Sequence, residues 1–259
     1  MNIFKQFYKS THSPKDIASF RFQGIGKTIL YVFLLTLLSI LPSIYYLSTM
    51  LTAGIEGTKS VMNNELPSFT IDNGSLSAET DVPITIDKGE FSIIVDPTGV
   101  ITTDDVEDEV NAFALLKNEI VVSAGGRIDT YSYSMLEDLT LTKNDFIDIV
   151  DTVDGVKGII IPVMSALIFL FSSAINFIEV SILALFGLAL KNLAGRDISY
   201  RRLWRMAAYS VTLPTVFFTI MSAINTPVPN SFLINWFVEI IILYLAIKEI
   251  PKEKATIEN

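Results

Sequence analysis

The sequence contains no cysteine and only one histidine, His12. The absence of cysteine excludes disulfide bonds, zinc–thiolate sites and cysteine nucleophiles. A single histidine does not make a metal site, because metal ligands come in groups. We therefore predict neither a metal nor a cofactor.

Motifs that identify enzymes are also lacking. There is no HExxH zinc motif, no GxSxG elbow and no Walker phosphate loop. The segment from Gly24 to Lys27 is too short for a phosphate loop, and it precedes an apolar run instead of following a strand. With the usual nucleophile and base pairs missing, we predict that the protein is not an enzyme.

Charge is distributed very unevenly along the 259 residues, whose formal net charge is −9. Between Leu51 and Val156 there are 21 Asp and Glu residues against five Lys and Arg residues. Basic residues prevail instead before Thr28 and again from Lys191 to Arg205. The negative charge thus belongs to one segment, and we predict no nucleic-acid partner.

Four apolar runs divide the chain. The longest, Ile159 to Leu190, contains Glu179 as its only charged residue. At about 1.5 Å per residue, a helix of this length exceeds a hydrocarbon core of about 30 Å. The runs predict transmembrane spans at 29–48, 159–190, 206–224 and 231–247. Pro214 is expected to kink the third span or to free a carbonyl group.

Lys and Arg near the ends of spans remain in the cytoplasm. This rule places both termini and a basic turn at 191–205 inside, with a tail at 248–259. The acidic segment 49–156 is then extracytoplasmic. Residues 1–28 form a cytoplasmic lead-in, either an amphipathic helix on the inner leaflet or a solvated segment. Ser13 and Pro14 predict a helix start there.

The acidic segment is predicted to be β-rich. Thr-Ile-Asp-Asn-Gly and Thr-Ile-Asp-Lys-Gly each indicate a strand, a turn and another strand, and Gly125-Gly126 indicates a third turn. These features predict a compact antiparallel sheet, followed by a helix capped by Thr142. The predicted fold class is an α+β membrane protein, a four-helix transmembrane bundle with a β-rich extracytoplasmic domain inserted between spans one and two.

Two carboxyl groups are predicted at similar depth within the membrane, on Glu179 and Glu239. Each has an amide one helical turn earlier, Asn176 and Asn235 respectively. Such costly groups face the interior of a bundle and find a partner or a proton. They indicate either a proton or cation site, or protonated carboxyl groups that hold helices together.

Two charged runs allow further interpretations. Arg196, Arg201, Arg202 and Arg205 either contact anionic lipid head groups or only set the topology. The acidic run from Asp104 to Glu109 offers oxygen ligands for Ca²⁺, but it lacks the spaced D-x-D-x-D-G loop. We therefore expect it to be a solvated loop.

Several segments resemble one known family. They are Ser19 to Gln23, Gly26 to Tyr31, and the Ile-Asp-Asn-Gly and Val-Asp-Pro-Thr-Gly turns. Together with the closing spans, they resemble domain of unknown function 1189, a family of multi-pass proteins from Gram-positive bacteria, some labelled maltodextrin utilization proteins. The segment from Trp204 to Pro214 is faintly similar to the Yip family of membrane proteins.

The resemblance supplies no catalytic residue. It implies a bacterial plasma-membrane protein, possessing an outer domain that binds a partner or ligand. We expect an accessory role in a transport or envelope-signalling complex, with sugar uptake as the variant that the family label suggests. The partners would be membrane lipids and a membrane or envelope protein. The alternative is a small proton- or cation-coupled transporter or channel that uses the intramembrane carboxyl groups.

Overall fold

The computed structural model describes residues 2–89, 91–136 and 139–252. It contains both helices and sheets, in two compact units. The helical unit comprises residues 1–48 and 161–259, and the sheet unit comprises residues 49–160. Most of the expected tail, residues 253–259, lies outside the described residues.

Helices account for all of the secondary structure in the described part of the helical unit. In chain order they are α1 (Ile3–Ser10), α2 (Pro14–Phe20), the first part of α3 (Ile25–Asn64), the last part of α5 (Lys143–Leu193), α6 (Tyr200–Ser210), α7 (Thr212–Ala223) and α8 (Ser231–Lys248). Four helical stretches among the described residues are long and apolar enough to cross a membrane: Ile25–Asn64, Lys143–Leu193, Tyr200–Ala223 and Ser231–Lys248.

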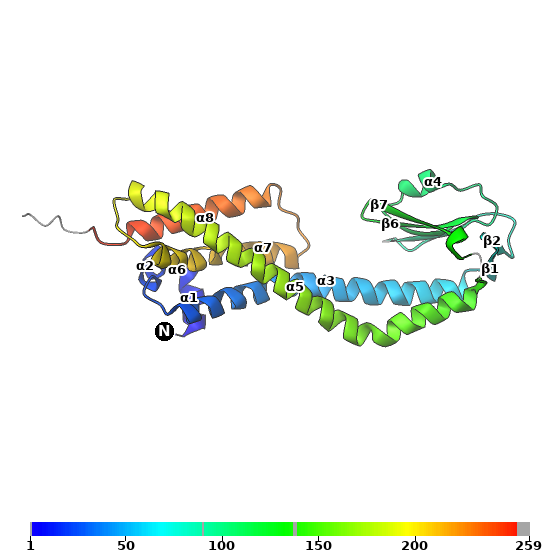
Figure 1. The fold of residues 1–259 in the computed structure, drawn as a ribbon, viewed down its shortest axis with the longest axis horizontal. Coiled ribbons are helices and arrows are strands. Elements are labelled where there is room, and N and C mark those ends of the chain that lie inside the picture. Colours follow the sequence, from blue (N-terminus) through cyan, green and yellow to red (C-terminus); the bar gives the residue numbers. More distant parts are fainter. Residues whose placement is uncertain (1, 90, 137–138, 253–259) are drawn as a thin grey trace, which may run out of the picture. The chain divides into compact units, whose positions relative to one another are not determined.

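The lead-in is part of the helical core. Ile17 and Phe20 of α2 are 0% and 2% exposed, and α2 packs against α6 and α8 (Figure 1). Its predicted start is confirmed, because Ser13 caps the helix and Pro14 occupies the first turn. The apolar side chains of α2 are covered by helices distant in sequence.

The basic turn is shorter than predicted. Helix α5 continues to Leu193, and Gly195 follows in a turn with a φ of +62°, as is common just after a helix C-terminus. Helix α6 begins at Tyr200, because the residues that follow Ser199 include good helix formers. Arg201, Arg202 and Arg205 therefore lie on a helix, which corrects the prediction of a turn extending to Arg205.

The third candidate span, predicted at 206–224, is found at Tyr200–Ala223 and consists of two helices. Helices α6 and α7 are separated at Val211, which has a turn conformation. Pro214 has no N–H for the carbonyl group of Ser210, and its ring crowds that carbonyl group. The expected effect of Pro214 is therefore seen as a break one turn before it.

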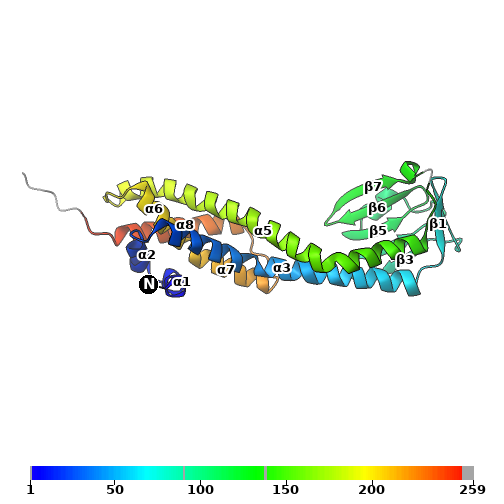
Figure 2. The same ribbon diagram turned by 60° about the horizontal axis from the view of Figure 1, so that its bottom comes forward.

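The described residues of the sheet unit form two sheets. One has the order β2-β1-β8 and the other β3-β4-β5-β6-β7, whose last three strands lie side by side in Figure 2. The strands are β1 (Phe69–Asp72), β2 (Ser75–Ala78), β3 (Ile84–Asp87), β4 (Ser92–Val95), β5 (Asn111–Leu115), β6 (Glu119–Ala124), β7 (Arg127–Ser132) and β8 (Leu141–Thr142). A 3-10 helix, η1 (Tyr133–Leu136), follows β7.

The three predicted turns are confirmed. Asn73 and Gly74 connect β1 to β2 with φ values of 48° and 74°, and Gly125 and Gly126 connect β6 to β7 with φ values of 61° and 80°. Positive φ at both central residues is what a tight two-residue hairpin requires. Gly89, with a φ of 79°, lies between β3 and β4.

The expectation of one antiparallel sheet was wrong. Strands β4 and β5 pair in parallel, because the chain between them forms helix α4 (Thr103–Glu107) and returns to the same end. Ile93 and Val95 pack on one face of the five-stranded sheet with Leu115. Ile94 packs on the other face with Val121. Strand β4 is therefore buried on both sides.

Candidate functional site

The clearest polar site in the helical unit joins α5 to α8. The side-chain amide nitrogen of Asn235 donates hydrogen bonds to Oε1 of Glu179, at 2.7 Å, and to Oε1 of Glu239, at 2.8 Å. Asn235 and Glu239 lie one turn apart on α8, and Glu179 reaches them from α5. One amide group thus holds two carboxyl groups together.

The two carboxyl groups differ in burial. The Glu239 residue is 1% exposed, and Glu179 is half-buried. No donor group among the described residues reaches Oε2 of Glu239. A proton shared between the carboxyl groups therefore fits this geometry, since two adjacent buried charges would be costly.

The second predicted amide lies elsewhere. The side-chain amide of Asn176, on α5, donates to the hydroxyl oxygen of Thr36 on α3, at 2.8 Å. Thr36 is fully buried and donates in turn to the carbonyl oxygen of Val32, at 3.0 Å. Asn176 thus connects α5 to α3, whereas Asn235 connects α5 to α8. Polar residues of α5 thus form hydrogen bonds with two neighbouring helices, α3 and α8.

The four arginines predicted to meet lipid head groups have different surroundings. Arg196 donates to the carbonyl oxygen of Lys248, at 3.0 Å, near the C-terminus of α8, and Arg205 donates to the carbonyl oxygen of Arg21, at 2.9 Å. Both therefore bind the protein's own backbone. Arg201 and Arg202 are exposed, and the guanidinium group of Arg202 lies 5.4 Å from the ring centre of Phe22. These last two have the exposure that head-group contact requires.

The acidic run from Asp104 to Glu109 is mostly a short helix. Asp105 accepts hydrogen bonds from the N–H and hydroxyl groups of Thr102, at 2.8 and 2.7 Å. These bonds lower the pKa of Asp105. The solvated loop that was expected is therefore α4 with a capping box. In the described part of the chain, no three His, Asp or Glu side chains gather as a metal site would require.

A second buried polar cluster was not predicted. The Tyr31 hydroxyl lies 2.7 Å from that of Thr212, and the Tyr209 hydroxyl donates to Oε1 of Gln6, at 3.4 Å. The rings of Tyr31 and Tyr209 lie 4.3 Å apart. All four residues are 0% exposed. They come from α1, α3, α6 and α7, so sequence spacing could not connect them.

Two of the segments that resemble the family contain residues of this cluster or next to it. Tyr31 belongs to the segment from Gly26 to Tyr31, and the nearby Phe20 belongs to that from Ser19 to Gln23. The ring of Phe20 lies 4.6 Å from that of Tyr209. Two segments that resemble the family therefore meet at one place in the helical unit.

Comparisons with known proteins give one family. A search of the curated proteins finds no match. A search of the solved structures also finds no match. The family model described as "Protein of unknown function (DUF1189)" matches residues 4–247, which is most of the chain. The protein therefore belongs to the DUF1189 family.

Proposed function

We propose that the protein is a multi-pass protein of the bacterial plasma membrane with both termini in the cytoplasm. Four apolar helical stretches in the described residues support this placement. The basic residues near Arg201 would lie inside and the acidic sheet unit outside, in keeping with the distribution of Lys and Arg around membrane spans.

The proposed role is that of a non-enzymatic accessory protein, whose outer domain binds a partner of a transport or envelope-signalling complex. One observation carries this proposal. The sheet unit has its own core and a surface groove of about 420 Å³. Charged and polar side chains line it, among them Thr98, Asp104, Lys117, Asn118 and Glu119. The maltodextrin label of some family members makes sugar uptake the first process to examine.

The groove has a defined architecture. The hydroxyl group of Thr103 donates to Oε1 of Glu119, at 2.7 Å, and this bond connects α4 to β6. Asp104 and Lys117 are exposed and of opposite charge. Opposite charges within one groove favour a partner with a complementary charge pattern, which contributes to specificity and association rate.

The test is affinity recovery of the tagged full-length protein from native membranes, with mass spectrometry. A variant with Asp104→Lys and Lys117→Glu reverses the groove charges at constant net charge. The control carries Arg127→Glu and Asp129→Lys, which reverses an exposed ion pair of β7 outside the groove. We expect the groove variant to recover about tenfold less partner, as loss of a central contact does, and the control to match wild type.

Two results would contradict the proposal that the groove binds a partner from a membrane complex. One is the absence of any specific membrane complex with the wild-type protein. The other is equal recovery of a complex with the groove variant and with wild type. The latter would mean that the partner binds elsewhere on the chain.

A second candidate function is proton- or cation-coupled transport, favoured by the carboxyl groups of Glu179 and Glu239 that share Asn235. A protonatable pair in an apolar surrounding is what such coupling uses. Glutamine at both positions keeps hydrogen-bonding capacity but cannot release a proton. It would therefore abolish coupled flux in reconstituted vesicles, yet leave partner recovery unchanged if the role is accessory.

A further inference from the structure

Helix α1 buries two polar side chains and exposes two aromatic ones. Gln6 and Ser10, which are polar, are 0% and 2% exposed, whereas Phe4 and Tyr8 are 67% and 68% exposed. A helix on the surface of a water-soluble protein buries its apolar stripe and exposes its polar one. The outer surroundings of α1 are therefore expected to be apolar.

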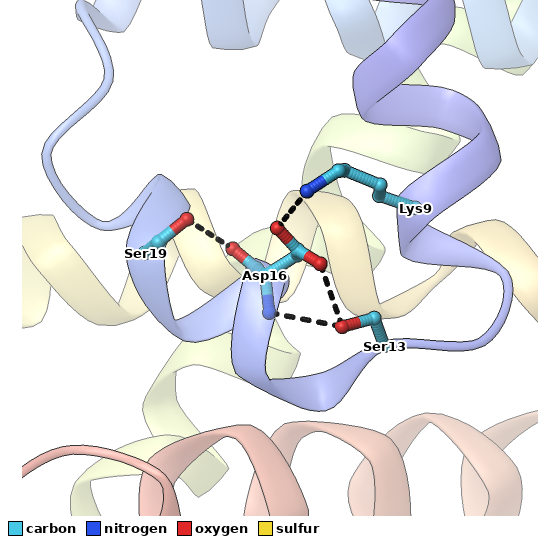
Figure 3. Close-up of polar contacts among 4 residues, drawn as sticks. All are labelled: Lys9, Ser13, Asp16 and Ser19. Carbon is cyan, nitrogen blue, oxygen red and sulfur yellow. Dashed lines mark hydrogen bonds and ion pairs between the residues drawn. The ribbon is translucent and has the colours of Figure 1, made fainter.

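Polar bonds fix α1 in this orientation. Lys9 contacts the carboxyl group of Asp16 at the start of α2, and the Ser13 hydroxyl donates to the same carboxyl group at 2.7 Å (Figure 3). The hydrogen bond from Lys9 lowers the pKa of Asp16. On its buried side, Gln6 accepts the bond from Tyr209. The outward direction of Phe4 is thus held from two sides.

An apolar groove of about 240 Å³ lies between α1 and α3. Its lining is formed entirely by apolar side chains, namely Phe4, Phe7, Leu34, Leu37, Leu38 and Leu41. An apolar cavity of roughly 150 Å³ already accommodates a molecule the size of benzene. The groove is therefore large enough for a segment of a hydrocarbon chain.

The charged residues of α1, the helix that forms one wall of the groove, are all basic. Helix α1 contains Lys5 and Lys9 and no acidic residue, and Lys5 is exposed. Because Lys9 is paired with Asp16, Lys5 is the cation on this helix that is placed to meet an anion. An apolar groove beside a cation on an interfacial helix has the chemistry of a phospholipid with an anionic head group.

We propose that the groove between α1 and α3 binds one acyl chain of an anionic phospholipid of the inner leaflet, with Lys5 at its head group. This proposal rests on the membrane placement proposed above. It assigns α1 as an interfacial helix, and it does not depend on the partner of the sheet unit. The acyl chain covers Phe4, and the head group neutralises Lys5.

The test uses the full-length protein in nanodiscs that contain phosphatidylglycerol with a photoactivatable acyl chain. We expect labelled peptides from residues 4–7 and 34–41. Leu38→Trp fills the groove and is expected to lower this labelling about tenfold, as the loss of a few buried CH₂ groups would. The control is Leu30→Trp, which places the same side chain on an exposed position of α3 outside the groove.

The head-group part is tested with Lys5→Glu, which leaves the groove lining intact. We expect it to lower the preference for phosphatidylglycerol over phosphatidylcholine about tenfold, since basic residues at the interface favour anionic lipid. The control is Lys15→Glu, the same charge change at an exposed position of α2. Equal preference in wild type and Lys5→Glu would overturn the head-group assignment.

Other outcomes separate the proposals. Equal labelling of the groove in wild type and Leu38→Trp would overturn the acyl-chain site. Cross-links from Phe4 to a second copy of the chain would show that a protein contact occupies the groove instead. Release of the protein from membranes by alkaline carbonate would refute the membrane placement itself, whereas retention without groove labelling would refute only the lipid site.

Discussion

Replacing Asn235 with Leu is expected to destabilise the helical unit by about 2–3 kcal/mol, because one buried and one half-buried carboxyl group would lose their shared donor. The Asn235 amide lies 2.7 Å from Oε1 of Glu179 and 2.8 Å from Oε1 of Glu239. Leucine fills the space but donates no hydrogen bond. Unfolding in mixed micelles, followed by circular dichroism, measures the change in free energy.

The matched control is Asn176→Leu. Asn176 is on α5 and makes one described hydrogen bond, to Thr36. A single interhelical hydrogen bond of this kind contributes about 0.6–1.7 kcal/mol, so its loss should cost less. Glutamine at both Glu179 and Glu239 should leave stability within about 1 kcal/mol of wild type, since hydrogen-bonding capacity is kept. Equal destabilisation by Asn235→Leu and Asn176→Leu would contradict the shared role of Asn235.

The Asp96→Asn variant is expected to lose about 2–4 kcal/mol of stability in the sheet unit. Asp96 is 0% exposed and follows β4. Its carboxylate accepts bonds from the N–H groups of Thr98, at 2.8 Å, Gly99, at 3.2 Å, and Ile101, at 2.6 Å. The Thr98 hydroxyl donates as well, at 2.5 Å. In the asparagine variant an NH₂ group replaces one carboxylate oxygen. This new donor then faces the N–H and hydroxyl donors that the carboxylate accepted from.

The same hydrogen bonds predict that the stability of the sheet unit depends on pH. Burial acts to raise the pKa of Asp96, but the hydrogen bonds from Thr98, Ile101 and Gly99 outweigh it, so the pKa is lowered. A carboxyl group with a lowered folded-state pKa stabilises the fold fully above its unfolded value of about 3.9, and this contribution is lost as the pH falls through the folded pKa. The Asn variant lacks this acid-dependent contribution.

Hydrogen exchange of the full-length protein measures both the loss of stability and its dependence on pH, through the protection of the amides of β4 and β5. The control is Asp87→Asn, because the exposed Asp87 carboxylate accepts one described bond, from the N–H of Gly89. We expect that variant to change stability by less than about 1 kcal/mol. Unchanged protection of β4 in Asp96→Asn would contradict the role given to this carboxylate.

Features of the fold with local causes could be predicted from the sequence. The Asn73-Gly74 turn and the Ser13 cap depend on residues a few positions apart, and both are found as expected. The parallel pairing of β4 with β5 could not be predicted, since it depends on the return of the chain through α4.

The candidate site also has parts that could be predicted from the sequence and parts that could not. Helical periodicity places Asn235 beside Glu239, and the structure adds Glu179 from another helix. Periodicity also places Asn176 beside Glu179, but the structure gives its amide to Thr36, because α3 covers that side of α5. The cluster of Tyr31 and Tyr209 joins helices that are far apart in sequence, so no spacing rule could have found it.

The most direct test of an external sheet unit is the accessibility of single introduced cysteines, because the natural sequence has no cysteine that would interfere. Ala124→Cys lies at an exposed position at the end of β6, and Ser199→Cys lies at an exposed position before α6. We predict that a membrane-impermeant maleimide labels position 124 in intact cells and position 199 only after permeabilisation. Labelling in the reverse order, or of both positions only after permeabilisation, would contradict an external sheet unit and the function proposed for it.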